Sequence, residues 1–193
     1  MQVDSVLSVS APADSSPRTT ALTNLGFLTV LHEANGYLGG YLVTNVWGRP
    51  LEFRLSSAVQ PNRVQHILYA ATLESYICAD LIGKTLVDKT AVPVQLIVTD
   101  RETVLDLRLK LECPVLWLAA ADDARASALA AGGAEVTPGQ SGRGPLLCHP
   151  RFADDVVRSR DLLGQLDAAF DLVEPFVRIR EAIGEARKMG VHK

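Results

Sequence analysis

The sequence predicts an α/β or α+β fold. We expect a mixed five-strand sheet that starts with a three-strand antiparallel meander, helices that cover it, and a kinked C-terminal helical segment. Three alternating apolar segments come first, at 27–32, 37–45 and 51–55. Two almost continuously apolar runs, 94–98 and 115–119, then alternate with helical stretches. Consecutive strands pair as a meander, whereas strands separated by helices need crossover connections.

Turn residues delimit the first three strands. Asn35 and Gly36 separate the first strand from the second, because both residue types tolerate positive φ. Gly39 and Gly40 follow early in the second strand, where they predict either a bulge or a close approach by another part of the chain. The segment 47–50 then turns the chain into the third strand.

A long amphipathic helix is predicted from Pro61 to about Lys89. Pro61 suits the first turn, because the N–H that proline lacks would have had no partner there. Glu74 lies at the edge of the helix's mostly apolar stripe. A second helical stretch, 101–111, separates the last two strands. The stripe itself follows helical spacing and consists of Val64, Ile67, Leu68, Ala71, Ser75, Cys78, Ile82 and Leu86.

Length and composition fit one domain with appendages. A chain of 193 residues can bury a sizeable core, and 48% hydrophobic with 21% charged residues is ordinary for a globular protein. We expect 1–20, rich in Ser, Thr, Pro and Ala, to be a disordered lead-in. Residues 21–150 would form the α/β domain. Residues 151–193 would form a helical segment, split or kinked at Pro175, that packs on the domain or on a partner.

The C-terminal segment contains a narrow apolar seam with 3-4-3-4 spacing, which packs either on the chain's own sheet or against a protein partner or second copy. If the seam is a homodimer interface, Leu166→Asp or Phe170→Asp should dissociate the dimer. The seam consists of Leu163, Leu166, Phe170, Val173 and Val177.

Charge and cysteine usage exclude some classes of function. A formal net charge of −3 argues against an obligate nucleic-acid binder that relies on a broad basic surface. Three widely spaced cysteines fit buried thiols in a reducing compartment better than a disulfide framework. Neither a secretory signal nor a bilayer-length apolar run is visible, so we expect a cytoplasmic protein without a membrane partner. Cys148 and His149 lack the spacing of a zinc site, and adjacency is weak evidence for a catalytic pair.

The order of elements from 27 to 120 resembles that of the ribonuclease H-like superfamily. The resemblance implies acidic residues on the first strand, on the following helix, at the end of the fourth strand and near the start of the last helix. The first strand has the uncharged Thr29 among apolar residues, so its acid would be Glu33 at the turn. The candidate catalytic set is therefore Glu33, Glu74, Asp100 and Asp154, with Asp122, Asp123 or Asp155 as alternatives for the last member.

Two functions stay open. The first is a non-catalytic intracellular interaction or accessory domain, possibly a degenerate ribonuclease H-like fold, for which no cofactor is expected. The second is a Mg²⁺-dependent nuclease or phosphodiesterase, which alone would have nucleic acid as a partner and would use Glu33 and Asp100 as metal ligands. Clustered carboxylates suit Mg²⁺, and two such ions can activate water and stabilise a leaving oxygen. Only the enzyme requires the carboxylates to converge.

Overall fold

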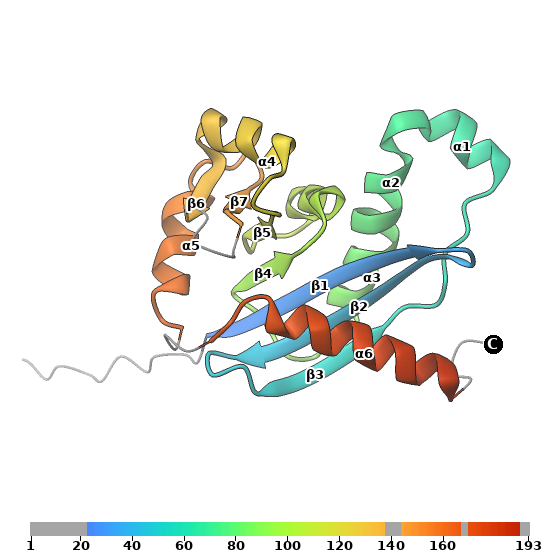
Figure 1. Cartoon of the computed structure of the whole chain (residues 1–193), viewed down its shortest axis with the longest axis horizontal. Coiled ribbons are helices and arrows are strands. Elements are labelled where there is room, and N and C mark those ends of the chain that lie inside the picture. Colours follow the sequence, from blue (N-terminus) through green and yellow to red (C-terminus); the bar gives the residue numbers. More distant parts are fainter. Residues whose placement is uncertain (1–22, 138–143, 167–169, 190–193) are drawn as a thin grey trace, which may run out of the picture.

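The described residues form one mixed sheet flanked by helices (Figure 1). The computed structural model describes residues 23–137, 144–166 and 170–189, so the predicted lead-in 1–20 lies outside the described residues. Within them, seven strands follow the order β3-β2-β1-β4-β5-β7-β6. The strands are β1 (Asn24–Glu33), β2 (Gly36–Asn45), β3 (Pro50–Leu55), β4 (Leu96–Thr99), β5 (Val115–Leu118), β6 (Glu135–Thr137) and β7 (Leu146–Cys148).

The first five strands have the predicted connections. β1, β2 and β3 pair as an antiparallel meander, β4 pairs parallel to β1, and β5 pairs parallel to β4. An antiparallel three-strand meander followed by two strands that alternate with helices is the arrangement on which the ribonuclease H-like resemblance rests. The α/β class, the meander and the resemblance in fold are therefore confirmed.

The predicted number of five strands is too low. β7 pairs antiparallel to β5, with Cys148 opposite Leu116, and β6 pairs antiparallel to β7. Each of these added strands is three residues long. So short a segment contains too few residues for an alternating pattern to show, and only the pairing with β5 makes Leu146–Cys148 a strand.

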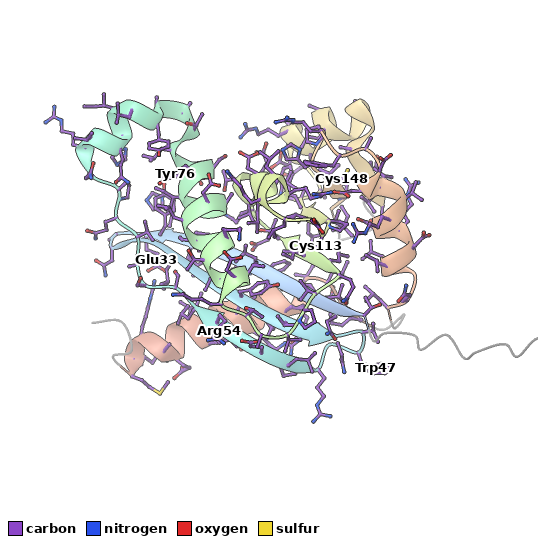
Figure 2. The ribbon with its side chains drawn as sticks, turned by 180° about the vertical axis from the view of Figure 1, so that it is seen from behind. Glu33, Trp47, Arg54, Tyr76, Cys113 and Cys148 are labelled. Atoms are coloured by element: carbon purple, nitrogen blue, oxygen red, sulfur yellow. The ribbon has the colours of Figure 1, made fainter. Side chains whose placement is uncertain are left out.

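Helices cover both faces of the meander, and Gly39 and Gly40 make this possible. The β1–β2 register runs continuously through both glycines, so there is no bulge between these strands here. Of the two predicted alternatives, the close approach of another part of the chain is the correct one. A Cβ at Gly39 would lie under 3.0 Å from Ile82, and one at Gly40 under 3.0 Å from Ile179. Ile82 lies in the π-helical turn η2 (Tyr76–Gly83), which covers the face seen in Figure 2. Ile179 lies in α6 (Glu174–Lys188), which crosses the opposite face in Figure 1.

The predicted continuous helix from 61 to 89 is interrupted, and this part of the prediction is wrong. Ala70 has φ 45°, a conformation that a residue with a Cβ rarely adopts, and the first helix ends there. α1 consequently projects away from the sheet (Figure 1), and its stripe residues Val64, Ile67 and Leu68 are exposed by 61%, 70% and 74%. The segment consists of α1 (Arg63–Tyr69), η1 (Ala70–Thr72), α2 (Leu73–Ser75), η2 and α3 (Lys84–Asp88).

The remaining helices connect and cover the other half of the sheet. The predicted helical stretch 101–111 is a 3₁₀ helix, η3 (Glu102–Lys110). Pro175 lies in the first turn of α6, where a proline is tolerated, so the C-terminal segment is two separate helices. The others are α4 (Ala124–Leu129), the π-helical turn η4 (Ala130–Ala134) and α5 (Asp155–Leu163). Among the described helices, none has the length and apolar character needed to cross a membrane.

The core has a separate apolar layer on each face of the meander. Under η2 and α3 it includes Leu28 and Tyr41, and under α6 it includes Phe27 and Phe176, whose rings meet edge to face at 5.7 Å between centroids. Of the predicted seam, Leu163, Leu166 and Phe170 are half-buried against the α6-side layer, whereas Val173 and Val177 are exposed. An acidic residue at Leu166 or Phe170 would therefore disturb this core, and cannot test for an interface.

Candidate functional site

The candidate site lies where β4 ends, at Asp100. Its Oδ2 accepts a hydrogen bond from the Arg180 guanidinium of α6, and its Oδ1 is buried with no hydrogen-bond partner among the described residues. The Asp100 side chain is 15% exposed. It opens onto a cavity of 390 Å³ that also contacts the end of β5 and the first half of α6. The carboxyl ends of parallel strands are a common position for ligand sites in α/β proteins.

Thr29 is the neighbour of Asp100 on β1. Leu28 is in register with Thr99, the last residue of β4, so Thr29 and Asp100 directly follow the last pair of β1 with β4. Both lie on the α6 side, since Thr29 alternates with Phe27 of the layer under α6 and Asp100 pairs with Arg180 of α6. Thr29 therefore occupies the place of the first-strand acid that the resemblance implies. Its Oγ1 is also buried, and no group in the described part of the chain bonds to it.

Glu33 and Glu74, the other two early candidates, lie elsewhere. Glu33 is four residues beyond Thr29 on β1, which corresponds to about 13 Å along the strand. Glu74 lies in α2, whose first residue, Leu73, packs in the layer on the opposite face of the sheet from α6. Each carboxylate has its own arginine: Glu33 pairs with Arg187, and Glu74 pairs with Arg101 at 3.5 Å. The structure does not bring Glu33, Glu74 and Asp100 together.

The candidates for the fourth acid are also dispersed. Asp154 is exposed at the start of α5, which packs against β6, and Asp122 is exposed in the turn after β5. Asp123 caps α4 by accepting hydrogen bonds from two backbone N–H groups, at 2.8 and 3.1 Å. Asp155 is buried and accepts two hydrogen bonds from Arg108, at 2.6 and 3.2 Å. Helix capping accounts for Asp123 and a buried ion pair accounts for Asp155, so neither carboxylate requires a catalytic role to explain its position.

The residues around Asp100 do not form a donor set suited to Mg²⁺. Among the described residues, the groups named here are one carboxylate, one hydroxyl and one guanidinium, whereas Mg²⁺ prefers carboxylate oxygens and retained water. Over the described ranges, no three His, Cys, Asp or Glu side chains are arranged to hold a metal ion. The positive charge beside Asp100 is supplied by Arg180.

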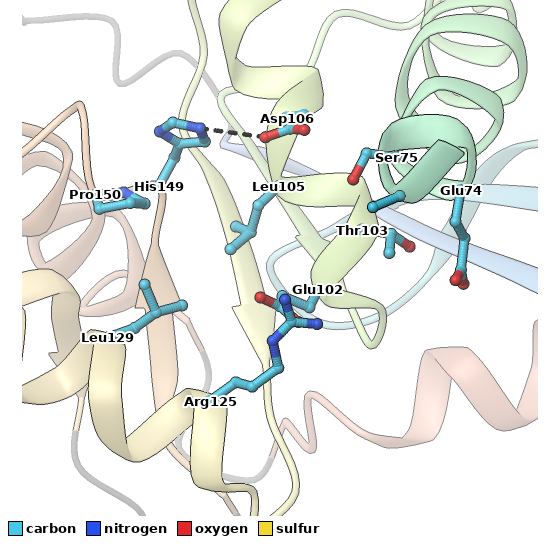
Figure 3. Close-up of a pocket in the computed structure, with 11 residues that line it drawn as sticks. Glu74, Ser75, Glu102, Thr103, Leu105, Asp106, Arg125, Leu129, His149 and Pro150 are labelled. Carbon is cyan, nitrogen blue, oxygen red and sulfur yellow. Dashed lines mark ion pairs between the residues drawn. The ribbon is translucent and has the colours of Figure 1, made fainter. Parts of the chain in front are cut away.

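A second cavity, of 260 Å³, lies between α2, η3 and the loop after β7 (Figure 3). The buried His149 lines it, with Nε2 3.4 Å from Asp106 Oδ1 and Nδ1 accepting the Arg151 N–H at 3.2 Å. Both ring nitrogens are thus engaged, so His149 is positioned as a structural residue. Burial raises the pKa of the nearby Glu102 carboxyl, and the Arg125 guanidinium opposes that shift. No local sequence pattern predicts this cavity, because its lining residues come from distant segments of the chain.

The cysteines are free thiols, and burial is their common feature. Cys78 and Cys148 are buried and Cys113 is half-buried. Burial raises the pKa of the Cys78 thiol to about 11 and raises the pKa of Cys148 above its ordinary value. The thiolate is the nucleophilic form, so these residues are not activated for nucleophilic chemistry.

Comparisons with known proteins find similarity in fold only. No protein-family model matches the chain, and no curated protein matches it in sequence. Among solved structures, human ENDOV is similar at 12% identity and a TM-score of 0.46, covering 93% of this chain and 93% of that chain. An endonuclease V from Ciona intestinalis, in complex with DNA containing an inosine followed by a ribo-adenosine, is similar at 8% identity and a TM-score of 0.35. That similarity covers 52% of this chain and 47% of the Ciona chain.

Proposed function

We propose that this chain is a non-catalytic protein-interaction domain built on a ribonuclease H-like sheet. The observation that carries the proposal is the ion pair between Asp100 and Arg180 at the end of β4. A cation at this point would have to displace a guanidinium that already neutralises the carboxylate. Beside it, Thr29 provides a hydroxyl at the position where the resemblance implies an acid.

The α6 helix extends this pattern along the sheet. Arg180 and Arg187 are seven residues apart, about two helical turns, so they project from similar sides of α6. They pair with Asp100 and Glu33, respectively. α6 therefore directs positive charge toward the part of the sheet where metal-dependent hydrolysis would require a cluster of free carboxylates.

Exposed apolar side chains support an interaction role. Val64, Ile67 and Leu68 are exposed together on the projecting helix α1. Trp47, Leu51 and Phe53 are exposed at the edge of the sheet, in β3 and the turn before it. Scattered apolar residues on a surface need no explanation, but grouped ones are typical of surfaces that bind other proteins.

The second candidate function is a Mg²⁺-dependent nuclease or phosphodiesterase, and one observation favours it. Asp100 Oδ1 and Thr29 Oγ1 are both buried without a partner in the described part of the chain, each just past the last pair of β1 with β4, and Asp100 lines the 390 Å³ cavity. Buried polar atoms without partners are uncommon and require an explanation, of which a bound ligand is one.

Calorimetric titration with Mn²⁺ and Mg²⁺ separates the two functions. The proteins compared are the wild type, Asp100→Asn and the control Asp88→Asn, which changes an exposed acid in α3. Cleavage of single- and double-stranded DNA and RNA is assayed on the same samples, and circular dichroism verifies their fold. We expect no saturable binding and no metal-dependent cleavage in any of the three. Saturable binding and cleavage that Asp100→Asn abolishes and Asp88→Asn retains would overturn the proposal in favour of the nuclease.

A further inference from the structure

The outer edge of β3 has no strand beside it in the described part of the chain, where β3 lies at the end of the sheet and pairs with β2 alone. Ser56 N–H donates to the Gly39 carbonyl at 2.9 Å. Hydrogen-bonded residues alternate along an antiparallel ladder, so Arg54 and Glu52 direct their backbone groups to β2. The N–H and C=O groups of Phe53 and Leu55 consequently face outward, and such an edge is a template for another strand.

The sequence of β3 is complementary to itself in the antiparallel direction. The five residues read Leu51, Glu52, Phe53, Arg54, Leu55. When two copies pair with Phe53 opposite Phe53, Glu52 of each copy lies opposite Arg54 of the other, and Leu51 lies opposite Leu55. Opposite charges and aromatic side chains directly across a sheet stabilise pairing, whereas like charges destabilise it. A parallel in-register pair would instead place the two Arg54 side chains together.

We infer that β3 is a homodimer interface, in which two copies of the chain pair their β3 strands antiparallel about a two-fold axis at Phe53. This register matches the backbone, because Phe53 and Leu55 are the residues whose hydrogen-bonding groups face outward. The inference rests on the proposed function as an interaction domain, and it names the partner as a second copy of this chain.

Apolar side chains beside the strand extend the interface. Leu51 and Phe53 are exposed by 44% and 39%. Phe53 points to the α6 side, since its register partner is Leu42 in the layer under α6. Val177 is exposed on α6 itself, and Trp47 is exposed in the turn that precedes β3. A two-fold axis perpendicular to the sheet places the α6 faces of both copies on the same side, so these groups from each copy become neighbours.

The backbone around Gly48 holds the turn and α6 together. Arg178 of α6 donates a hydrogen bond to the Gly48 carbonyl at 3.1 Å. A Cβ at Gly48 would lie 2.6 Å from the Phe170 ring, and its φ of +75° favours glycine. Trp47 and Arg54 both lie along the sheet edge that β3 and this turn form (Figure 2). The exposed edge is therefore a preformed surface. The register of β3 with β2 shifts only near Leu51.

The exposed helix α1 does not offer the same self-complementarity. It carries Arg63 and His66 and no acidic residue, so two copies of α1 packed together would bring like charges close. α1 therefore serves as the control surface in the test.

The experiment measures the mass of the full chain by light scattering and by sedimentation over a range of concentrations. We expect the wild type to reach twice the chain mass of 20.8 kDa, and the control Leu68→Glu on α1 to behave like the wild type. Arg54→Glu should be monomeric, because it places carboxylates across from each other in both pairs. Phe53→Thr should also be monomeric, and it tests the interface without a change in charge.

Mixing charge variants tests the register itself. Glu52→Arg alone should be monomeric, and mixing it with Arg54→Glu should restore a dimer, since each pair again joins opposite charges. Glu52 also accepts the Ala91 and Val92 N–H groups and pairs with Arg54 of its own chain at 2.6 Å, so thermal unfolding must first establish that Glu52→Arg and Arg54→Glu are folded. If either charge variant is not folded, Phe53→Thr decides the question.

Three results would overturn the inference: a wild type that stays monomeric at every concentration, a dimer that survives Arg54→Glu and Phe53→Thr, or a dimer that Leu68→Glu dissociates. Failure here is distinguishable from failure of the proposed function. Metal-dependent cleavage would overturn the non-catalytic role whatever the mass, and a monomer without metal binding would overturn only the homodimer.

Discussion

Replacing Gly40 by alanine should destabilise the fold, because β2 has no room for a methyl group on its α6 side. The new Cβ would lie under 3.0 Å from Ile179 Cγ2 and 3.2 Å from Ile183 Cδ1. Carbon atoms without a bond between them prefer about 3.5–4.0 Å. Either α6 must move away from the sheet or Ile179 must leave its rotamer.

The size of this effect follows from two opposing contributions. Overpacking a core typically costs about 1–3 kcal/mol. Alanine also restricts the unfolded chain more than glycine does, which returns roughly 0.4–1 kcal/mol. Because the added Cβ would lie well inside contact distance of Ile179, the upper half of the overpacking range applies, and we expect Gly40→Ala to lower the free energy of unfolding by about 1–2.5 kcal/mol. For a chain of this length, each 1 kcal/mol lowers Tm by about 2–4 °C.

Urea unfolding followed by tryptophan fluorescence measures the change. Gly184→Ala, on the same helix α6, is the matched control, since no described heavy atom lies within 4 Å of the Cβ it would add. Alanine is the better helix former, so the control should stabilise by roughly 0.5–1 kcal/mol. Ile179→Ala makes room for the new methyl group, so combining it with Gly40→Ala should cost less than the sum of the two changes.

A Gly40→Ala protein as stable as the wild type, measured beside a Gly184→Ala protein with its expected gain, would contradict the close contact between α6 and β2. Strictly additive effects of Gly40→Ala and Ile179→Ala on the free energy of unfolding would contradict it as well. Either outcome would mean that α6 does not approach β2 as closely as the structure describes.

Two further predictions concern buried groups. Asp155→Asn should lower the free energy of unfolding by about 2–4 kcal/mol, because it removes the carboxylate from a buried ion pair with Arg108. Urea titrations measure this change, and a loss below about 1 kcal/mol would contradict a tight ion pair. Burial raises the pKa of Cys78 from 9.0 to about 11, so the folded state retains a proton that the unfolded state releases. The stability that Cys78 contributes is thus complete below pH 9 and is lost as pH rises toward 11, by at most about 1.4 kcal/mol per pH unit. Unfolding measured at several pH values should show a shallower decline in Cys78→Ala, and identical slopes would count against this explanation.

Local patterns predicted much of the fold. Alternation along 27–32, 37–45 and 51–55 identified the meander, and the apolar runs near β4 and β5 identified the two parallel strands. The alternative of a close approach at Gly39 and Gly40 was also correct. These features depend on residues that are neighbours in sequence, and the period of a strand or helix is visible over such short distances.

The interrupted helix shows where local patterns fail. Val64, Ile67 and Leu68 have the spacing of a buried stripe, and that spacing is the same whether the helix packs on a sheet or projects from it. The break depends on Ala70 adopting φ 45°, and alanine carries no signal for this conformation. The three-residue strands β6 and β7 were missed because pairing, not periodicity, defines them.

The candidate site was predictable only in part. Asp100 follows an apolar strand, so its position at the strand end could be predicted from sequence. The position of Thr29 near Asp100 depends on the register of β1 with β4, and no local sequence pattern predicts that register. The pairing of Asp100 with Arg180 joins residues 80 positions apart, and that of Glu33 with Arg187 joins residues 154 positions apart.

By itself, the sequence determined the order of the three meander strands, the two parallel strands and the helical stretches between them, because backbone geometry imposes periods of two and 3.6 on neighbouring side chains. Only the tertiary structure decided that each early candidate carboxylate faces an arginine and that α1 leaves the sheet. It also decided that β3 lies at the end of the sheet, with no strand beyond it among the residues that the structure describes. Such features depend on how distant elements pack against one another, and packing is a property of three-dimensional arrangement that sequence spacing does not contain.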